Sequence, residues 1–179
     1  GVKYFEKPPL FYWLQAGSIK QLNPIIVQAE STLTETKRES YVGSISEWAV
    51  RLPNALVALL GCLLVYAAGR LLFERRAGLL SAIILASSLL YFVLARMVTL
   101  DMTLSFCLSA SLLAFLVAIN GPPGLGRRFL LYSAYSFSAL AVLTKGLVGL
   151  LFPTMIIGLW ILLTNQWRLL KQLYLPSGF

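Results

Sequence analysis

A run of apolar residues from position 52 to 73 restricts the fold of this chain more than any other feature. Arg70 is the only charged residue within it. A helix of about 20 apolar residues is long enough to cross the hydrocarbon core of a bilayer. Four further apolar runs follow, at 77–95, 102–119, 129–143 and 147–163. The sequence therefore predicts an all-α fold, a polytopic transmembrane helix bundle of about five spans.

The composition supports a membrane protein and excludes several kinds of chemistry. Hydrophobic residues make up 58% of the chain and charged residues 12%, whereas a soluble domain has roughly 45–50% apolar and 25% charged residues. The chain has no histidine, which excludes histidine bases and histidine metal ligands from it. Cys62 and Cys107 lie within apolar runs, which predicts small buried hydrophobes. The formal charge of +8 is not gathered into a basic patch with aromatic residues, so no nucleic-acid partner is predicted.

The residues before the first span, 1–51, are predicted to form an external juxtamembrane segment. Pro9 suits the first turn of a helix because it needs no backbone donor there. The apolar pattern over 10–21 predicts an amphipathic helix that is too short and too polar to span, which places it at the membrane interface. Residues 23–47 are polar and predict a loop. Beyond the last span, 164–179 are predicted to form a cytoplasmic tail.

The charges of the short connections predict the orientation of the bundle, because cytoplasmic loops are enriched in Lys and Arg. Basic residues gather in every second connection and in the tail; they are Arg70, Arg75, Arg76, Arg127, Arg128, Arg168 and Lys171. These parts are predicted to face the cytoplasm, so 1–51 and the connections 96–101 and 144–146 face the other side. The expected location is a multi-pass plasma membrane, the inner membrane in a bacterium, with a site on the periplasmic or external side.

This orientation gathers cations from separate connections on the external side, where Arg51 also lies. Lys7 stands just before a predicted helix start, whose unpaired N–H groups also attract anions. Arg96 can bind a phosphate through two hydrogen bonds, and Lys145 lies in a connection so tight that it stays near the membrane surface. At that level the natural anion is a lipid phosphate. Each cation alone has the alternative of a snorkelling side chain, so the prediction depends on their convergence.

Two carboxylates accompany these cations. Glu6 can ligate a divalent cation through its hard oxygens or pair with a base. Asp101 either caps the helix that follows it or takes part in substrate binding. Charges so close to the hydrocarbon are costly, which favours functional or paired residues. Gly146, directly after Lys145, is expected to supply the backbone conformation of the tight turn.

Four motifs, in this order along the chain, resemble the membrane-embedded C-type glycosyltransferases. They are Tyr4-Phe5-Glu6-Lys7-Pro8-Pro9-Leu10-Phe11-Tyr12-Trp13, then Ser46-Glu47 with Arg51-Leu52-Pro53, then the segment from Arg96 to Asp101, and finally Thr144-Lys145-Gly146. The first and last motifs are the most specific. Within the family, the motifs resemble the branch of aminoarabinose transferase and the related protein O-mannosyltransferases.

The resemblance implies a membrane glycosyltransferase that takes a sugar from a polyprenyl-phosphate carrier and inverts its anomeric carbon. The acceptor would be a lipid, a protein hydroxyl or another glycan. By the resemblance, Lys7 would bind the carrier phosphate, and Glu6 is a candidate ligand of a divalent metal ion. Arg96 and Asp101 would line the site near the sugar. Lys145 would add positive charge near the phosphate.

Two departures from the family pattern qualify this expectation. The family's first span and acidic loop precede the Lys-Pro-Pro motif, so the expected catalytic acid lies upstream of Gly1 and the chain alone is expected to be inactive. Residues 24–41 are longer than the family's usual link and are interpreted as an inserted loop. Two other hypotheses are a non-catalytic lipid-phosphate-binding or scaffold module and a transporter. The transporter ranks last because the charges stand at span ends, not near mid-membrane.

Overall fold

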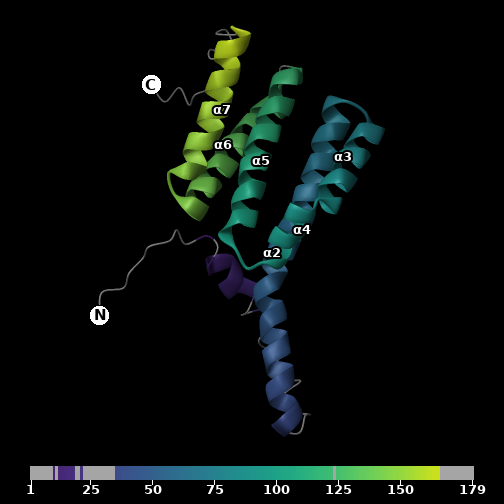
Figure 1. The fold of residues 1–179 in the computed structure, drawn as a ribbon. Coiled ribbons are helices and arrows are strands. Elements are labelled where there is room, and N and C mark those ends of the chain that lie inside the picture. The colour runs from purple at the N-terminus through teal and green to yellow at the C-terminus, as the bar shows by residue number, and fades with distance from the viewer. Residues whose placement is uncertain (1–9, 11, 19–20, 22–34, 123, 166–179) are drawn as a thin grey trace, which may run out of the picture.

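The computed structural model describes residues 10, 12–18, 21, 35–122 and 124–165. Throughout these residues the regular structure is helical, which confirms the predicted all-α fold (Figure 1). Residues 10, 12–18 and 21 are helical, as predicted for the interfacial segment. The longer helices are α2 (Glu35–Leu72), α3 (Arg75–Ser87), α4 (Leu89–Arg96), α5 (Leu100–Asn120), α6 (Leu125–Lys145) and α7 (Val148–Thr164).

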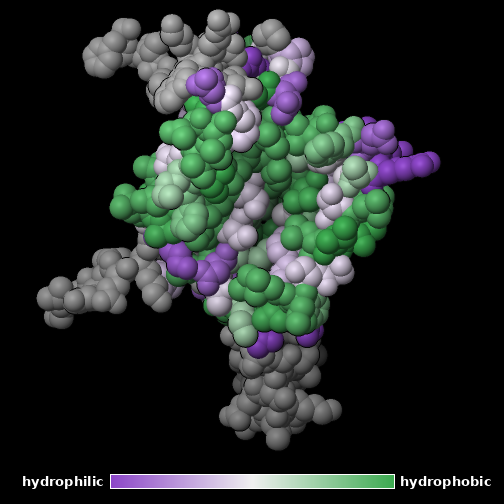
Figure 2. Space-filling view, turned by 45° about the horizontal axis from the view of Figure 1, so that its top comes forward, coloured by the Kyte–Doolittle hydropathy of each residue, from purple (hydrophilic) through white to green (hydrophobic). Residues whose placement is uncertain are grey.

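The connections between helices gather at two opposite ends of the bundle. The α2–α3 and α5–α6 connections and the end of α7 lie at one end, which is the top of Figure 1. The α4–α5 and α6–α7 connections lie at the other end, which we call the link end. The arginine-rich connections and the weakly charged ones are thus separated, as the charge pattern predicts. Figure 2 shows hydrophilic residues in zones separated by a hydrophobic belt, as expected for helices that cross a bilayer.

The number of crossings supported by length and composition is smaller than the number predicted. Among the described helices, Val50–Leu72 within α2 and Leu100–Asn120 are long and apolar enough to cross a bilayer. The pair α3 and α4 would make a third crossing, although the two helices meet at a bend of 63°. α7 is apolar but has only 17 residues. All five predicted spans are therefore helical, whereas two or three of them qualify as crossings by this measure.

Helix α2 begins well before the predicted first span. It runs from Glu35, through the predicted boundary at 51/52, to Leu72. The loop predicted over 23–47, part of which was interpreted as an insertion, is therefore wrong for its described residues from Glu35 onward. Residues 35–39 read Glu-Thr-Lys-Arg-Glu, and Glu, Lys and Arg all have high helix propensity. Their polarity therefore does not exclude a helix.

The second predicted span, 77–95, is broken between Ser87 and Ser88. Ser88 has an extended backbone, with φ −64° and ψ 122°, which separates α3 from α4. After the bend, α4 packs against α2, where the hydroxyl of Tyr91 donates a hydrogen bond to the carbonyl of Ala58 at 2.8 Å. Both α3 and α4 therefore pack against α2, on either side of the bend.

Helix α5 lies at the centre of the packing and contacts α2, α6 and α7. Its buried face meets α6 in two apolar clusters, so these two helices form the firmest pair in the bundle. Cys107 is buried there, as the sequence predicts, whereas Cys62 on α2 is only partly buried. The buried members of the clusters are Leu104, Cys107, Phe115, Ala118, Leu131, Ala134 and Ala141.

Glycines let two pairs of helices approach closely. A Cβ on Gly69 of α2 would lie 2.7 Å from the Cα of Gly78 of α3, so the two backbones meet there. Small residues such as Gly78 permit this close contact between membrane helices. Ser81, also on α3, donates to its own helix, to the carbonyl of Ala77 at 2.8 Å.

Substituting Gly149 by alanine should destabilise the protein by about 1–3 kcal/mol, because overpacking forces the surrounding backbone to move. A Cβ on Gly149 of α7 would overlap the backbone of Ala141 in α6. Gly158 is a matched control in the same helix, since a Cβ there meets nothing within 4 Å. Thermal unfolding in detergent should show a lower Tm for Gly149→Ala and an unchanged or higher Tm for Gly158→Ala. Equal Tm values for the two variants would contradict the packing of α6 on α7.

Candidate functional site

An ion pair at the link end joins two of the residues that the sequence singles out. The Nζ of Lys145, the last residue of α6, contacts the Oδ1 of Asp101, in the first turn of α5. The two residues are 44 positions apart in the chain. Their side chains remain 46% and 49% exposed, respectively. The pair therefore combines opposite charges that solvent or a substrate can still reach.

The local sequence explains how Lys145 reaches this position. Gly146 has a left-handed backbone, with φ 71°, which ends α6 and confirms the role predicted for it. The hydroxyl of Thr144 donates to the carbonyl of Ala141 at 2.6 Å and is fully buried. Thr144 thus points into the bundle while the next residue, Lys145, points out of it toward α5.

The structure contradicts one of the two roles considered for Asp101, and the role in substrate binding stays a prediction. The N-cap residue of α5 is Thr99, and it makes no side-chain capping hydrogen bond. Asp101 lies two positions further on, inside the first turn, where its carboxylate also benefits from the positive end of the helix dipole. Capping by Asp101 is therefore wrong, because the helix begins earlier than that role requires. The carboxylate instead faces Lys145.

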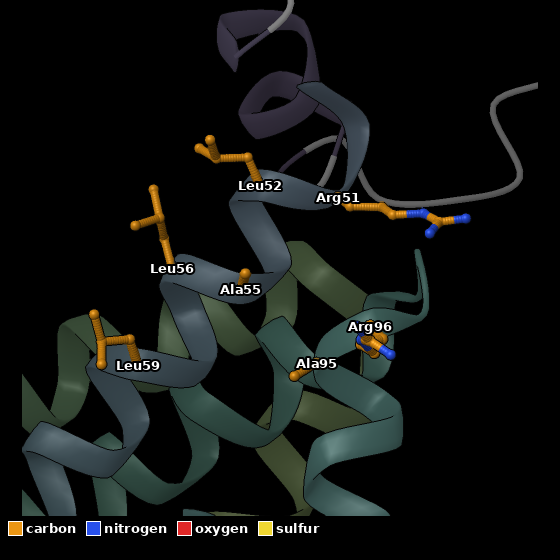
Figure 3. A pocket seen from close by; sticks show the side chains of 7 residues that line it. All are labelled: Arg51, Leu52, Ala55, Leu56, Leu59, Ala95 and Arg96. Carbon is orange, nitrogen blue, oxygen red and sulfur yellow. The ribbon is translucent and has the colours of Figure 1, made fainter. Parts of the chain in front are cut away.

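Arg96 ends α4 and stands at one end of an apolar groove between α2 and α4. The groove has a volume of about 520 Å³. Figure 3 shows Arg96 and Arg51 at the same end of it, on neighbouring helices, with leucines following one another along α2. The guanidinium carbon of Arg96 lies 5.2 Å from the centre of the Phe92 ring. The remaining lining residues are Leu52, Ala55, Leu56, Leu59 and Ala95.

Asn54 is a site residue that the sequence reasoning missed. It lies on α2 and is only 2% exposed. Its Nδ2 donates to the carbonyls of Met97, at 2.5 Å, and Thr99, at 3.2 Å. Both carbonyls belong to residues 97–99, the link between α4 and α5. The available signal was that Asn54 is the only amide side chain in the apolar run 52–73.

The structure brings together some of the predicted residues and leaves others out. Asp101 and Lys145 are in contact, and Arg96 precedes the link that leads to Asp101. Glu6 and Lys7 lie outside the described residues. Among the residues that are described, no three His, Cys, Asp or Glu side chains are grouped to hold a metal ion. The divalent metal thus stays a prediction that depends on Glu6.

The arrangement can bind an amphiphile with an anionic headgroup. Guanidinium groups pair with phosphate oxygens through directed hydrogen bonds, and an apolar groove accepts a hydrocarbon chain. The half-exposed carboxylate of Asp101 can accept a hydrogen bond from a hydroxyl held beside that headgroup. Cation, carboxylate and apolar groove all lie toward the same membrane surface.

Comparison with known proteins finds similarity to a family of mannosyltransferases and to two arabinosyl transferases. The profile of the dolichyl-phosphate-mannose-protein mannosyltransferase family matches residues 40–177. The chain is 28% identical over 170 residues to undecaprenyl phosphate-alpha-4-amino-4-deoxy-L-arabinose arabinosyl transferase 2 of Sodalis glossinidius, a match that covers 94% of this chain and 27% of that protein. It is 26% identical over 156 residues to the corresponding transferase 1 of Proteus mirabilis, covering 87% and 25%. The chain thus spans about a quarter of the length of these relatives.

Two solved structures are similar to this chain in both fold and sequence. Both are crystal structures of ArnT from Cupriavidus metallidurans, one in the apo state and one bound to undecaprenyl phosphate. Each matches with a TM-score of 0.79 and 30% sequence identity over 97% of this chain. The match covers 29% of the apo chain and 28% of the bound chain. Together with the apolar helices, these similarities identify a membrane protein.

Proposed function

Since the chain belongs to the dolichyl-phosphate-mannose-protein mannosyltransferase family, we propose that it is part of an integral membrane glycosyltransferase whose donor is a sugar on a polyprenyl-phosphate carrier. The observation that carries the proposal is the groove with Arg51 and Arg96 at one end and apolar walls along its length. A polyprenyl phosphate has the same division, since one charged group is attached to a long hydrocarbon chain. The relatives named for undecaprenyl-phosphate-linked aminoarabinose, and the ArnT structure bound to undecaprenyl phosphate, support the same carrier.

The chemistry of sugar transfer gives each charged group a role. An acceptor hydroxyl attacks the anomeric carbon, the bond from that carbon to the phosphate oxygen breaks, and the configuration inverts. Negative charge accumulates on the departing phosphate, and fixed cations stabilise it best where water is scarce. In the proposal, Lys7, Arg96 and Lys145 face the phosphate, and Arg96 and Asp101 also line the site near the sugar. A divalent metal held by Glu6 would add positive charge at the same place.

The base that takes the acceptor proton is not assigned to this chain. In the proposal, the catalytic acid of the full-length protein is the one that the family resemblance places ahead of the Lys-Pro-Pro motif. The acceptor is a lipid, a protein or a glycan, and the names of the arabinosyl transferases give only the donor. The alternative, a non-catalytic module that only holds the lipid phosphate, keeps the groove and the cations but lacks the base.

Undecaprenyl phosphate should bind the purified full-length protein at least about tenfold more tightly than undecaprenol, because hydrogen bonds to a charged group contribute roughly 1.5–3 kcal/mol. Native mass spectrometry with both lipids measures the ratio. The same protein, given undecaprenyl-phosphate-linked aminoarabinose and lipid A, should release undecaprenyl phosphate. Lys7→Ala should weaken phosphate binding, whereas Lys3→Ala, in the same segment, should not. Binding without transfer would favour the non-catalytic module, and equal affinity for the two lipids would sink the phosphate site.

The proposal also assigns the two ends of the bundle to the two sides of the membrane. A cysteine at Lys145 should react with a membrane-impermeant maleimide from the periplasmic side, and a cysteine at Arg128 only after the cytoplasmic side is opened, because short basic loops stay in the cytoplasm. Both single cysteines are placed in a chain whose Cys62 and Cys107 are replaced by alanine. Cytoplasmic labelling at position 145 would overturn the assignment of the link end to the external side.

A further inference from the structure

The amide of Asn54 holds the connection between two of the site residues. Met97 and Thr99 lie in the link between α4 and α5, where the helix is interrupted. The carbonyl of Met97 accepts one backbone hydrogen bond there, from the N–H of Thr99 at 3.0 Å. The Nδ2 of Asn54 donates to the carbonyls of both residues, at 2.5 and 3.2 Å, across 43 and 45 positions of sequence. Buried backbone carbonyls need such partners, because an unpaired buried polar group is costly. One side chain of α2 thus anchors the whole link.

The position of this anchor in the chain connects it to the site. Arg96 directly precedes Met97, and Asp101 follows Thr99 by two positions. The link is only three residues long, so the path of its backbone sets the position of the last residue of α4 relative to the first residue of α5. Any shift of the two carbonyls held by Asn54 moves Arg96 and Asp101 relative to each other. Through Asp101, the same shift reaches Lys145.

The face of α2 that carries Asn54 also holds α4. Ala58, one turn further on, accepts a hydrogen bond from the hydroxyl of Tyr91 at 2.8 Å. Gly61, one turn beyond that, leaves room for the same hydroxyl, since a Cβ at Gly61 would overlap it. Positions 54, 58 and 61 therefore form one stripe along α2. This stripe fixes α4 at Tyr91 and the link at Asn54.

A buried asparagine in an apolar helix is unexpected unless its N–H donors are needed to pair other polar groups. Asparagine is a poor helix former, and polar groups inside a membrane are costly unless they are paired. Asn120 on α5 shows the ordinary alternative, because its Nδ2 donates to Leu116 of its own helix at 2.9 Å and the side chain is exposed. Asn54 differs in that both of its bonds leave its own helix.

We propose that Asn54 is a positioning residue of the transfer site: its amide fixes the 97–99 link and thereby sets Arg96 and Asp101 in their working arrangement. The role of Asn54 in sugar transfer rests on the proposed function. Its role in fixing the link depends only on its two hydrogen bonds. Asn54 need not touch the substrate, since it acts through the backbone that carries the two charged side chains.

The test compares Asn54→Leu, which keeps the volume and removes both donors, with Asn120→Leu as the matched control. In the full-length protein, hydrogen–deuterium exchange of residues 97–100 should become about tenfold faster in Asn54→Leu, because local opening is no longer opposed by the anchor. The kcat for transfer from undecaprenyl-phosphate-linked aminoarabinose should fall at least about tenfold, since small misplacements of reacting groups are costly. KM should change much less than kcat, and Asn120→Leu should alter neither exchange nor kcat.

Two further variants keep the test decisive. Asn54→Gln retains the amide donors and should recover part of the lost kcat and of the slow exchange. Asn54→Ala serves as the donor-free variant if Asn54→Leu does not fold. Unchanged exchange in the donor-free variant would overturn the anchor, and faster exchange with an unchanged kcat would overturn the positioning role. If the wild-type protein transfers no sugar, the proposed function fails by itself, while the exchange measurement still decides whether Asn54 fixes the link.

Discussion

Asp101→Asn in the full-length protein should lower the rate of sugar transfer by roughly 10- to 100-fold, because hydrogen bonds made by a charged group contribute about 1.5–3 kcal/mol. The carboxylate is the partner of Lys145, and both side chains are about half exposed, at 49% and 46%. A substrate beside them can therefore reach the charges. Neutralising Asp101 removes an acceptor for a sugar or acceptor hydroxyl and leaves Lys145 with an unbalanced charge next to the proposed phosphate.

The same substitution should leave the stability of the protein nearly unchanged. Ion pairs between exposed side chains contribute about 0–1 kcal/mol, and this pair is too exposed to exceed that range by much. A purely structural pair therefore predicts a small loss of stability and no loss of turnover. A pair that belongs to the transfer site predicts the reverse. Transfer kinetics and thermal unfolding, measured on one preparation, separate the two roles.

Two controls sharpen this prediction. The exchanged variant Asp101→Lys with Lys145→Asp restores an ion pair with opposite polarity, so stability should stay close to that of the wild type while transfer stays low. Glu74→Gln removes a carboxylate at the opposite end of the bundle and should leave transfer unchanged. If the exchanged variant regained wild-type transfer, the pair would be acting only as a clasp between α5 and α6.

The sequence predicted the distribution of charges between the two ends of the bundle, and the reason is physical. Short connections force successive helices to reverse, so every second connection must meet at the same end. The predictions for the link end therefore followed from the order of apolar runs and basic residues alone. Gly146 was predicted for a similar reason, since a two-residue turn after Lys145 demands an unusual backbone.

The contact between Asp101 and Lys145 could not be predicted as a contact. It depends on α5 packing beside α6, and α5 is apolar around nearly its whole circumference, so its pattern does not reveal which face meets which helix. The break between Ser87 and Ser88 was missed because serine is tolerated inside membrane helices as well as at their ends. The helical start of α2 at Glu35 was missed because polar composition was taken to indicate a loop.

Asn54 illustrates a different limit of prediction from the sequence. Its residue type marks it as unusual within an apolar run, but its partners are carbonyls of the main chain more than 40 positions away. Backbone acceptors leave no trace in the sequence, because every residue carries one. Side chains that bind to distant backbone are therefore the part of a site that the sequence hides most completely.

Arg96→Ala should weaken the binding of undecaprenyl phosphate to the full-length protein by about tenfold or more, because a charge-assisted guanidinium–phosphate contact is lost. Arg96 stands at the end of the groove, and within the part of the chain that the structure describes it forms no ion pair. Its contact with the ring of Phe92 holds the guanidinium near that end at modest strength. Native mass spectrometry with undecaprenyl phosphate measures the change.

The contribution of the aliphatic stem of Arg96 to lipid binding must be measured separately from that of its charge, because long cationic side chains also cover apolar surface. Arg96→Met keeps most of the stem and should bind the lipid as weakly as Arg96→Ala. Arg96→Lys keeps the charge but not the planar pair of donors, so its affinity should lie between those of the wild type and Arg96→Ala. Arg70→Ala, at the opposite end of the bundle, should leave the affinity unchanged. Should Arg96→Met bind as the wild type does, Arg96 would be a snorkelling side chain that anchors α4 at the membrane surface, and the phosphate would have to be held by the other cations of the link end.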